Sequence, residues 1–496
     1  MRRILIGLVS ACVSFAALAT EFVWTGAAGD GKWSTKENWA GNAVPPSNEL
    51  SKLTTDMTSV TCVDLSAAGG KTISLDETVV VQAVSCMPRD ESRTVTLAGD
   101  GKLLCQHAYT WGNMPAYFIA RDSQLVLNVD YELSSVRSSG TLLGGGTLVV
   151  NKDASGLANN DPRFCLDGCI SFGGTMTVDG ALNFWRLQNE GRTRVRFLEG
   201  SEFSVGTLLT GAAGFLSPSG YEQDGGSVSV GSVYITTPAE WNSSWSETLA
   251  YKMNDGVLEA ADGIYLGTMP EGFSKHFPRG DFEMSGGTVR TSVLASERNS
   301  NYYKLNGGTV VIGSGGLVVT ENTAGRTFVA NTEPDFQLGA VTISASADWA
   351  ADSRLAVQLS GGTVFDLADH DVTINGAVSG VGGLLKRGAG SLTVAGAYSA
   401  AGEIRVEDGS LVFGAGSSLS GAASVDACGG KVSFLGTLGA LSDHFVLSVD
   451  SMEDVSVGAS VEMAVAKLVV GRRIEEVISL LKGVECRGGT SCPDQL

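Results

Sequence analysis

Residues 360–414 read SGGTVFDLADHDVTINGAVSGVGGLLKRGAGSLTVAGAYSAAGEIRVEDGSLVFG. Short runs of β-branched, aromatic and aliphatic residues alternate there with steps rich in Gly, Asn and Asp, a pattern that is typical of strands separated by turns. No part of the stretch has an apolar period of helical spacing that is long enough to compete. The expected strands are residues 363–365, 372–374, 392–394, 404–406 and 411–413.

A Gly-Gly step followed by β-forming residues recurs across much of the chain. Thr or Ser often follows the glycines, as in GGTVVI from Gly307. Neighbouring copies are about 20 to 31 residues apart, or about twice that distance where one copy has diverged. This drifting period predicts a solenoid whose coils are made of short strands. The copies begin at Gly145, Gly173, Gly225, Gly286, Gly307, Gly361, Gly382 and Gly429.

One coil of such a solenoid cannot bury its apolar face alone. Stacked coils hydrogen-bond strand on strand at about 4.8 Å and share one interior, and glycine corners supply the backbone conformations that the bends need. Alternate residues of each strand then point inward. In the copy at Gly307, Val310 and Ile312 share one face and Thr309 and Val311 the other, and the sequence leaves open which face is inside.

The composition fits an exported all-β protein. The 496 residues include 65 Gly and only 11 Pro, and 43% are hydrophobic, which argues against disorder. The formal net charge is −19, so the chain repels a phosphate backbone and we expect no nucleic-acid partner. We interpret the charge as keeping an exported chain soluble; cation binding and repulsion of anionic glycans are the alternatives.

The first residues have the features of a secretory leader. Arg2 and Arg3 precede an apolar core, and Ala17-Leu18-Ala19 is a small-residue cleavage site, which predicts a signal peptide of residues 1–19. A lipoprotein-type box at residues 9–12 is the alternative, although it leaves only a short apolar core. No later run is apolar for the ~18 residues of a membrane-spanning helix, so we expect no such segment in the mature chain.

Both ends of the predicted solenoid differ in composition from its coils. Residues 20–50 contain Trp24, Trp33 and Trp39, which we expect to cap the open end of the core; a sugar-stacking platform is the alternative. The coils are predicted over residues 51–450, interrupted by loop insertions near 238–245 and 269–281, where function usually lies.

Residues 451–496 are predicted to form a C-terminal cap. Within them RRIEEVISLLK, residues 472–482, has its apolar side chains at helical spacing, with Glu475 and Glu476 early and Lys482 late. We expect a short helix over the last coil, and a membrane-surface helix is the alternative.

Residues 366–414 resemble the autotransporter-associated β-strand repeat. The matching pieces are DLADHDVTING, VSGVGGLLKRGAGSLTVAG and GEIRVEDGSLVFG, and the opening WTGAAGDGKWSTKENWAGNAVPP is similar to the N-termini of such proteins. The resemblance implies a right-handed parallel β-helix that is exported to the cell surface, as passenger segments are. The translocator barrel of autotransporters needs many alternating strands of about ten residues, and we find no such series.

Three groups of side chains are candidates for chemistry or binding. The carboxylates of the DLADHD stretch with His370 suit glycoside hydrolysis, and an acid-rich segment with Arg163 suits an exposed catalytic face. Trp241 and Trp245 suit stacking on a sugar or on a neighbouring coil. For the two acidic groups, solvated turn residues are the simpler interpretation. The acids are Asp366, Asp369 and Asp371 in the first group and Asp153, Asp161 and Asp167 in the second.

The cysteines fit an oxidising compartment rather than a metal site. Export permits disulfides, and Cys165 with Cys169 and Cys486 with Cys492 are plausible local pairs. Their spacings do not match zinc patterns, so we assign no metal, cofactor or catalytic residue.

The sequence therefore predicts an all-β protein, a right-handed parallel β-helix with a Trp-rich N-terminal cap and a short helical C-terminal cap. We expect a secreted or cell-surface protein that acts without catalysis in adhesion, envelope structure or loop-mediated binding, with a cell-surface glycan or protein as partner. A polysaccharide-active β-helix lyase or glycoside hydrolase is the alternative. The two differ in whether carboxylates converge in one groove or are scattered over turns.

Overall fold

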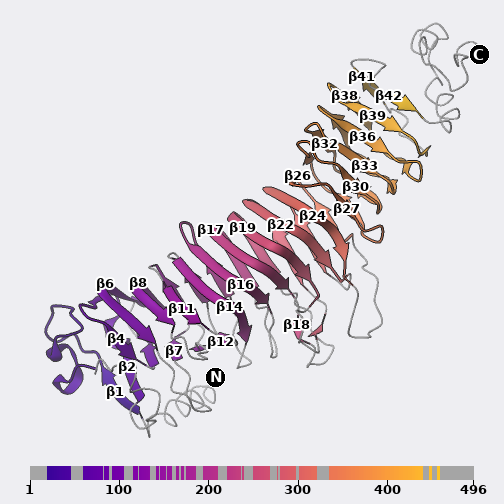
Figure 1. Cartoon of the computed structure of the whole chain (residues 1–496). Coiled ribbons are helices and arrows are strands. Elements are labelled where there is room, and N and C mark those ends of the chain that lie inside the picture. The colour runs from indigo at the N-terminus through magenta and orange to yellow at the C-terminus, as the bar shows by residue number, and fades with distance from the viewer. Residues whose placement is uncertain are drawn as a thin grey trace, which may run out of the picture. The chain divides into compact units, whose positions relative to one another are not determined.

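The computed structural model describes most of the strand-forming chain (Figure 1). The described residues are 19–45, 60–81, 83–88, 92–105, 116–120, 122–133, 141–143, 146–151, 154–158, 163–166, 169–172, 175–185, 194–210, 220–235, 237–238, 250–268, 276–277, 280–297, 301–320, 334–439, 446–449 and 455–457. The predicted leader, apart from Ala19, and the predicted helix at 472–482 lie outside them.

The described chain is nearly all β and divides into two compact units. The first holds residues 1–261 and 267–281, and the second holds residues 262–266 and 282–496. Apart from one short antiparallel pair, the described strands pair in parallel, and three short 3-10 helices, η1 (Lys36–Asn38), η2 (Ala40–Asn42) and η3 (Ser66–Ala68), lie near the N-terminus.

The first unit contains strands whose parallel partners lie in register, as in β10 between β8 and β13 and in β16 between β14 and β17. Its elements are β1 (Ala19–Val23), β2 (Val60–Asp64), β3 (Thr72–Ser74), β4 (Val79–Val81), β5 (Ala83–Cys86), β6 (Thr94–Cys105), β7 (Ala116–Ile119), β8 (Gln124–Leu133), β9 (Thr141–Leu143), β10 (Thr147–Val150), β11 (Ala154–Ala158), β12 (Arg163–Leu166), β13 (Cys169–Phe172), β14 (Thr175–Trp185), β15 (Arg194–Phe197), β16 (Glu202–Thr210), β17 (Gly220–Ile235), β18 (Thr237–Pro238), most of β19 (Ala250–Leu266) and β20 (His276–Phe277).

The second unit begins with longer strands and continues as a regular series. The early strands are β21 (Asp281–Met284), β22 (Thr288–Ser296), β23 (Tyr302–Leu305) and β24 (Thr309–Val319). From Trp349 onward each described strand pairs with the third strand before it, so that every turn consists of three strands. Three parallel ladders result, and β27, β30, β33 and β36 of one ladder lie side by side in Figure 1.

The three ladders are named here by their order within a turn. The first ladder is β25 (Phe336–Leu338), β28 (Val357–Leu359), β31 (Val378–Gly380), β34 (Ala397–Tyr398), β37 (Ser418–Leu419) and β40 (Thr437–Leu438). The second ladder is β26 (Thr342–Ala345), β29 (Thr363–Asp366), β32 (Leu384–Arg387), β35 (Glu403–Val406), β38 (Ser424–Ala427) and β41 (Val446–Val449). The third ladder is β27 (Trp349–Ala351), β30 (Val372–Ile374), β33 (Ser391–Val394), β36 (Ser410–Phe413), β39 (Lys431–Phe434) and β42 (Val455–Val457).

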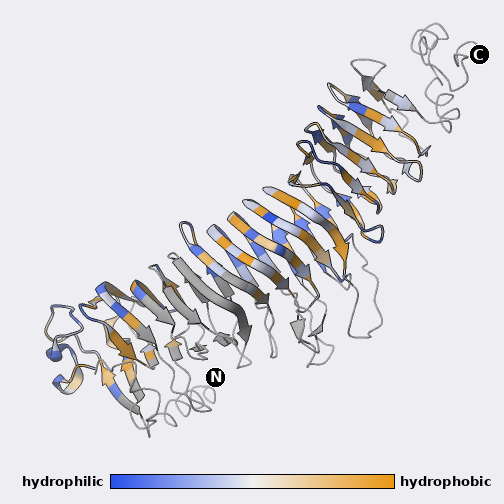
Figure 2. Cartoon of the chain, in the orientation of Figure 1, coloured by the Kyte–Doolittle hydropathy of each residue, from blue (hydrophilic) through white to orange (hydrophobic). Residues whose placement is uncertain are grey.

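Alternation along each strand decides which side chains form the core. In β24 Val310 and Ile312 are buried and Thr309 and Val311 are half-buried, which answers the question that the sequence left open. The same alternation is visible as a change of colour along the strands in Figure 2. Each buried aliphatic or aromatic side chain stabilises the fold by roughly 1.5–3 kcal/mol relative to its exposed state, and parallel stacking repeats this gain in every turn.

Aromatic rings continue the stacking inside both units. In the first unit the ring centroids of Phe197 and Tyr221 lie 6.1 Å apart, and those of Tyr221 and Tyr251 lie 5.7 Å apart. In the second unit Tyr303 stacks on Phe336 at 4.7 Å. The phenol of Tyr251 donates a hydrogen bond to Gln223 Oε1 at 2.7 Å, so this buried polar pair is satisfied inside the stack.

Glycine is required where the corners of neighbouring turns touch. A Cβ atom on Gly376 would lie 1.7 Å from the carbonyl oxygen of Leu355 in the turn before it, whereas a Cβ on Gly362 would meet nothing within 4 Å. Gly308 takes a φ of +80°, a conformation that other residues adopt only with strain. The Gly-rich steps of the sequence are therefore corners at which one backbone packs directly on another.

We predict that Gly376→Ala lowers the free energy of unfolding by about 1–3 kcal/mol, because the new methyl group must displace a backbone carbonyl. Gly362→Ala is the matched control, and it should be neutral or stabilise the fold by up to about 1 kcal/mol. Urea denaturation followed by circular dichroism measures both. Equal stability of the two variants would contradict the argument for backbone contact at this corner.

We predict that stability falls as the pH rises above about 10, in part through Tyr398. Burial raises the pKa of the Tyr398 phenol, so its contribution is complete below the unfolded-state pKa of about 10 and is lost as the pH rises further. Tyr398→Phe removes this dependence, and no described residue accepts a hydrogen bond from that hydroxyl. The variant should therefore lose less stability than wild type between pH 8 and pH 11 in urea titrations.

Tyr251→Phe is the contrasting variant for the same titrations. It breaks the hydrogen bond to Gln223, so it should cost about 1–3 kcal/mol already at pH 8. If Tyr398→Phe and wild type lose equal stability between the two pH values, the role assigned to the Tyr398 phenol is wrong.

Candidate functional site

The three N-terminal tryptophans form a buried cluster. Trp24, Trp33 and Trp39 are each 1% exposed. Trp39 meets Trp24 and Trp33 edge-on, with ring centroids 5.0 Å and 4.7 Å apart, and its Nε1 donates to the carbonyl oxygen of Trp33 at 2.7 Å. Rings buried in this way cannot act as an exposed sugar-stacking platform.

Backbone hydrogen bonds join this Trp-rich segment to the first strands. Trp24 N donates to Asp64 O, and Trp33 N donates to Ser74 O, both at 2.8 Å, while Ser74 N donates to Gly31 O at 2.8 Å. The segment thus occupies backbone groups of β2 and β3 that an open edge would present to other chains.

The Asp30 carboxylate is hydrogen-bonded to several groups of the Trp-rich segment in which it lies. It accepts hydrogen bonds from Thr35 Oγ1 and Asn38 Nδ2, each at 2.6 Å, and from the backbone of Lys32 at 3.1 Å. These bonds, led by that from Thr35, hold the pKa of Asp30 below its usual value. The carboxylate is used to shape the loop.

The first group of predicted acids lies at the corner between β29 and β30. His370 has its Nδ1 3.5 Å from Asp348 and its Nε2 3.7 Å from Asp369. Asp348 accepts a hydrogen bond from the backbone N–H of Asp371 at 2.9 Å, and Asp371 in turn accepts one from the N–H of Ser391 at 2.8 Å. Two of these carboxylates therefore link successive turns through backbone donors, as turn residues do.

The second ladder carries a network of charged side chains on its outer side. Arg387 donates to Glu407 at 2.7 Å, and Arg405 lies 3.2 Å from Glu407 and 3.8 Å from Asp426. The hydrogen bond from Arg387 is the main cause of the lowered pKa of Glu407. Because the groups are exposed, each pair adds little stability. The main effect of the network is that positive and negative side chains alternate along the outer side of the second ladder.

Lys386 is a buried ionisable side chain that the sequence analysis did not single out. It is 0% exposed, and its Nζ donates to the carbonyl oxygens of Arg387 at 2.8 Å, Gly388 at 2.6 Å and Asp408 at 3.2 Å. Burial lowers its pKa, opposed by the nearby carboxylates of Asp408 and Asp366. The side chain therefore clamps the corners of two successive turns.

A signal for this lysine was present in the sequence. In LLKR, residues 384–387, alternation places Lys386 on the same side as the buried Leu384, and Leu385 and Arg387 on the other. An inward lysine in a strand needs hydrogen-bond acceptors around it, and the following glycine corner supplies carbonyl groups.

A short pair of strands joins the start of the first predicted loop insertion to the second insertion. β18 and β20 form an antiparallel pair, with Thr237 opposite Phe277 and Pro238 opposite His276. Trp241 and Trp245 lie outside the described residues, as do Asp153, Asp161 and Asp167. Arg163 starts β12, and its side chain is not described.

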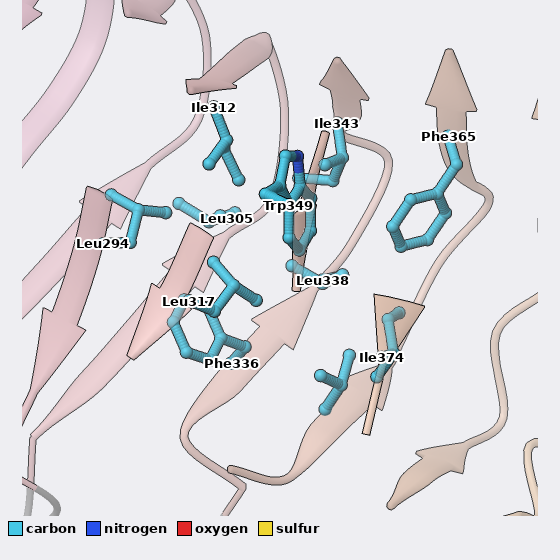
Figure 3. Close-up of a pocket in the computed structure, with 11 residues that line it drawn as sticks. Leu294, Leu305, Ile312, Leu317, Phe336, Leu338, Ile343, Trp349, Phe365 and Ile374 are labelled. Atoms are coloured by element: carbon cyan, nitrogen blue, oxygen red, sulfur yellow. The ribbon is translucent and has the colours of Figure 1, made fainter. Parts of the chain in front are cut away.

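The second unit contains a small space between its ladders. Leu305, Leu317, Phe336, Trp349 and other apolar side chains point toward one another around it (Figure 3). Its volume is about 10 Å³, which is at the lower limit for one water molecule, and apolar cavities of this kind stay dry. It is a packing void in the core and offers no ligand site.

The described part of the chain contains free thiols but neither a metal-binding cluster nor a membrane-spanning helix. No group of three or more His, Cys, Asp or Glu residues there is arranged to hold a metal ion. Cys86 and Cys428 are free thiols, and burial raises the pKa of Cys86 to about 12. Cys165 and Cys169 lie in β12 and β13, which belong to different strand pairings, and Cys486 and Cys492 are outside the described residues. No helix there is long and apolar enough to cross a membrane.

Comparison of the chain with models of protein families, with curated proteins and with solved structures finds no match.

We predict that Lys386→Met lowers the free energy of unfolding by about 1–3 kcal/mol, because it leaves buried carbonyl groups without a donor. Arg387→Met is the matched control, since it removes the neighbouring charge from the exposed side of the same strand and should cost at most about 1 kcal/mol. Denaturant titrations at pH 7 compare the two. A Lys386→Met protein as stable as wild type would refute the clamp.

Proposed function

We propose that this chain is a secreted or cell-surface protein built as a right-handed parallel β-helix, similar to autotransporter passengers, and that it acts without catalysis. Its roles are adhesion, envelope structure or binding through displayed loops. The observation that carries the proposal is the regular pairing from Trp349 to Val457, in which every described strand stacks in parallel on the third strand before it. Such a stack is a rigid support along which side chains recur at fixed spacing.

The use of the charged groups supports a non-catalytic role. Asp348 and Asp371 hold backbone N–H groups of the next turn, and Glu407 is paired with two arginines. Retaining and inverting glycosidases need two carboxyl groups about 5–9.5 Å apart that face the same bond, whereas these carboxylates are already engaged in holding the stack.

Export is supported by the sequence of residues 1–19, whose paired arginines, apolar core and small-residue site are typical of a leader. The passenger-like assignment rests on the repeat at residues 366–414, whose pieces contain β30, β31, β32, β33, β35 and β36 with the corners between them.

We predict that the full chain, expressed with its own leader in a Gram-negative host, is exported and begins at Thr20. Mass spectrometry of the N-terminus and cell fractionation measure this, and Ala19→Trp, which blocks the small-residue cleavage site, should retain the leader. The purified protein should release no reducing ends from a panel of acidic and neutral polysaccharides. Cytoplasmic retention of the wild-type chain, or depolymerisation of any of the glycans, would overturn the proposal.

A further inference from the structure

The first ladder presents an outer surface without charged side chains. Its outward residues alternate with buried ones, as in β25 and β28, where Gln337 and Gln358 are flanked by buried side chains and pair directly across the strands. Ser379 of β31 continues this column, and because Val378 pairs with Tyr398, the outward residues of the next strands lie two positions earlier in register. The six uncharged positions, which we call the neutral column, are Gln337, Gln358 and Ser379 in one row and Ala397, Ser418 and Thr437 in the row beside it.

The second ladder of the same turns has the opposite character. Its strands carry Asp366, Arg387, Glu403, Arg405 and Asp426 on the outside. The whole chain carries a net charge of −19. The charges of these strands therefore lie mainly on the second ladder, and an uncharged partner that lies along the first ladder has few ions to desolvate.

An outward aromatic residue stands at the start of the neutral column. β23 pairs with β25, which places Lys304 opposite Gln337. Tyr302 comes two residues before Lys304 in β23, so it lies on the same side of the sheet. The ammonium of Lys304 lies 5.8 Å from the Tyr302 ring centroid and 3.4 Å from Glu283, so its charge is paired. A tyrosine offers an apolar ring and a polar tip, and the amides and hydroxyls above it donate and accept hydrogen bonds.

The dimensions favour a linear partner over a second copy of the chain. Six strands at about 4.8 Å span roughly 25 Å, and two to three residues per strand at about 3.3 Å span at most roughly 10 Å. The resulting area of roughly 250 Å² is far below the ~800 Å² per partner of a stable protein interface. A narrow column of hydrogen-bonding groups along the stack instead fits a polymer with repeated uncharged hydroxyl groups.

We infer that the neutral column, with Tyr302 at its start, binds an uncharged linear polysaccharide that lies along the stack. The inference rests on the proposed function, for which it names the ligand class and the face. The ring of Tyr302 packs against a sugar ring, and Gln337 and Gln358 exchange hydrogen bonds with sugar hydroxyls. Acidic polysaccharides are repelled by the net negative chain.

The test uses the full-length mature chain and immobilised polysaccharides. The neutral probes are dextran, mannan and xyloglucan, and the acidic probes are alginate and polygalacturonate, with binding measured by biolayer interferometry. Wild type should bind at least one neutral polymer and neither acidic one. The double variant Gln337→Glu and Gln358→Glu keeps the side-chain shape but introduces two charges and removes two amide donors, and it should weaken binding at least about tenfold. Tyr302→Ala should weaken it by a similar factor.

The matched control adds the same two charges to the other face. Thr342→Glu with Ser344→Glu places both on β26 of the second ladder, and its binding should stay within about twofold of wild type. Absence of binding to all three neutral polymers, binding to the acidic ones, or an equal loss in this control would overturn the inference, as would sedimentation showing that the column instead joins two copies of the chain.

These outcomes are separable from failure of the proposed function. Circular dichroism and N-terminal mass spectrometry on every variant report whether the protein is exported and folded as β structure. An exported, folded chain that ignores neutral polymers removes the ligand assignment alone. A chain that is not exported, or that cleaves its glycan, removes the proposed function.

Discussion

The structure depends on one constraint: every turn must offer its backbone N–H and C=O groups to the turns on both sides, in register. Between Phe336 and Leu438, paired residues of the first ladder follow one another by 19 to 21 positions in the chain. The corners must then overlie one another as closely as the strands do. At Gly376 that approach leaves no space for a Cβ atom, and this explains why the chain has 65 glycines and only 11 prolines, which lack an N–H donor.

The same constraint explains where polar groups are buried. A corner cannot use regular ladder bonds for all its carbonyl groups, and an unsatisfied buried carbonyl costs about 1–3 kcal/mol. Lys386 donates hydrogen bonds to such carbonyl oxygens, in its own corner and in the next turn. Asp348 and Asp371 accept hydrogen bonds from backbone N–H groups of the next turn. Asp371, one of the acids that the sequence suggested for catalysis, thus holds a backbone group of the next turn.

Local pattern was sufficient to predict five strands of the central stretch, whereas the short strands β31 and β34 of the first ladder were not among the expected runs. The expected runs at 372–374 and 411–413 correspond to β30 and β36, the second with one additional residue at its start. The pattern could not decide which face of a strand lies inside. Alternation puts Val310 and Ile312 on one face, but only the pairing of the strands shows that this face is the buried one. Lys386 was missed because a lysine is ordinarily assigned to the surface. The roles of Asp348 and Asp371 depend on residues about 20 positions away, which no short motif records.

A stacked chain also changes what a functional site can be. Residues that are neighbours in space, such as Gln337 and Gln358, are copies of one position in successive turns, so chemistry is repeated along a column and is not gathered around one point. A repeated column recognises best a partner that is itself repeated, because each added turn contributes a further weak contact to the same partner. The separation of charged and neutral columns on different ladders then allows one regular backbone to present distinct surfaces without any change in its fold.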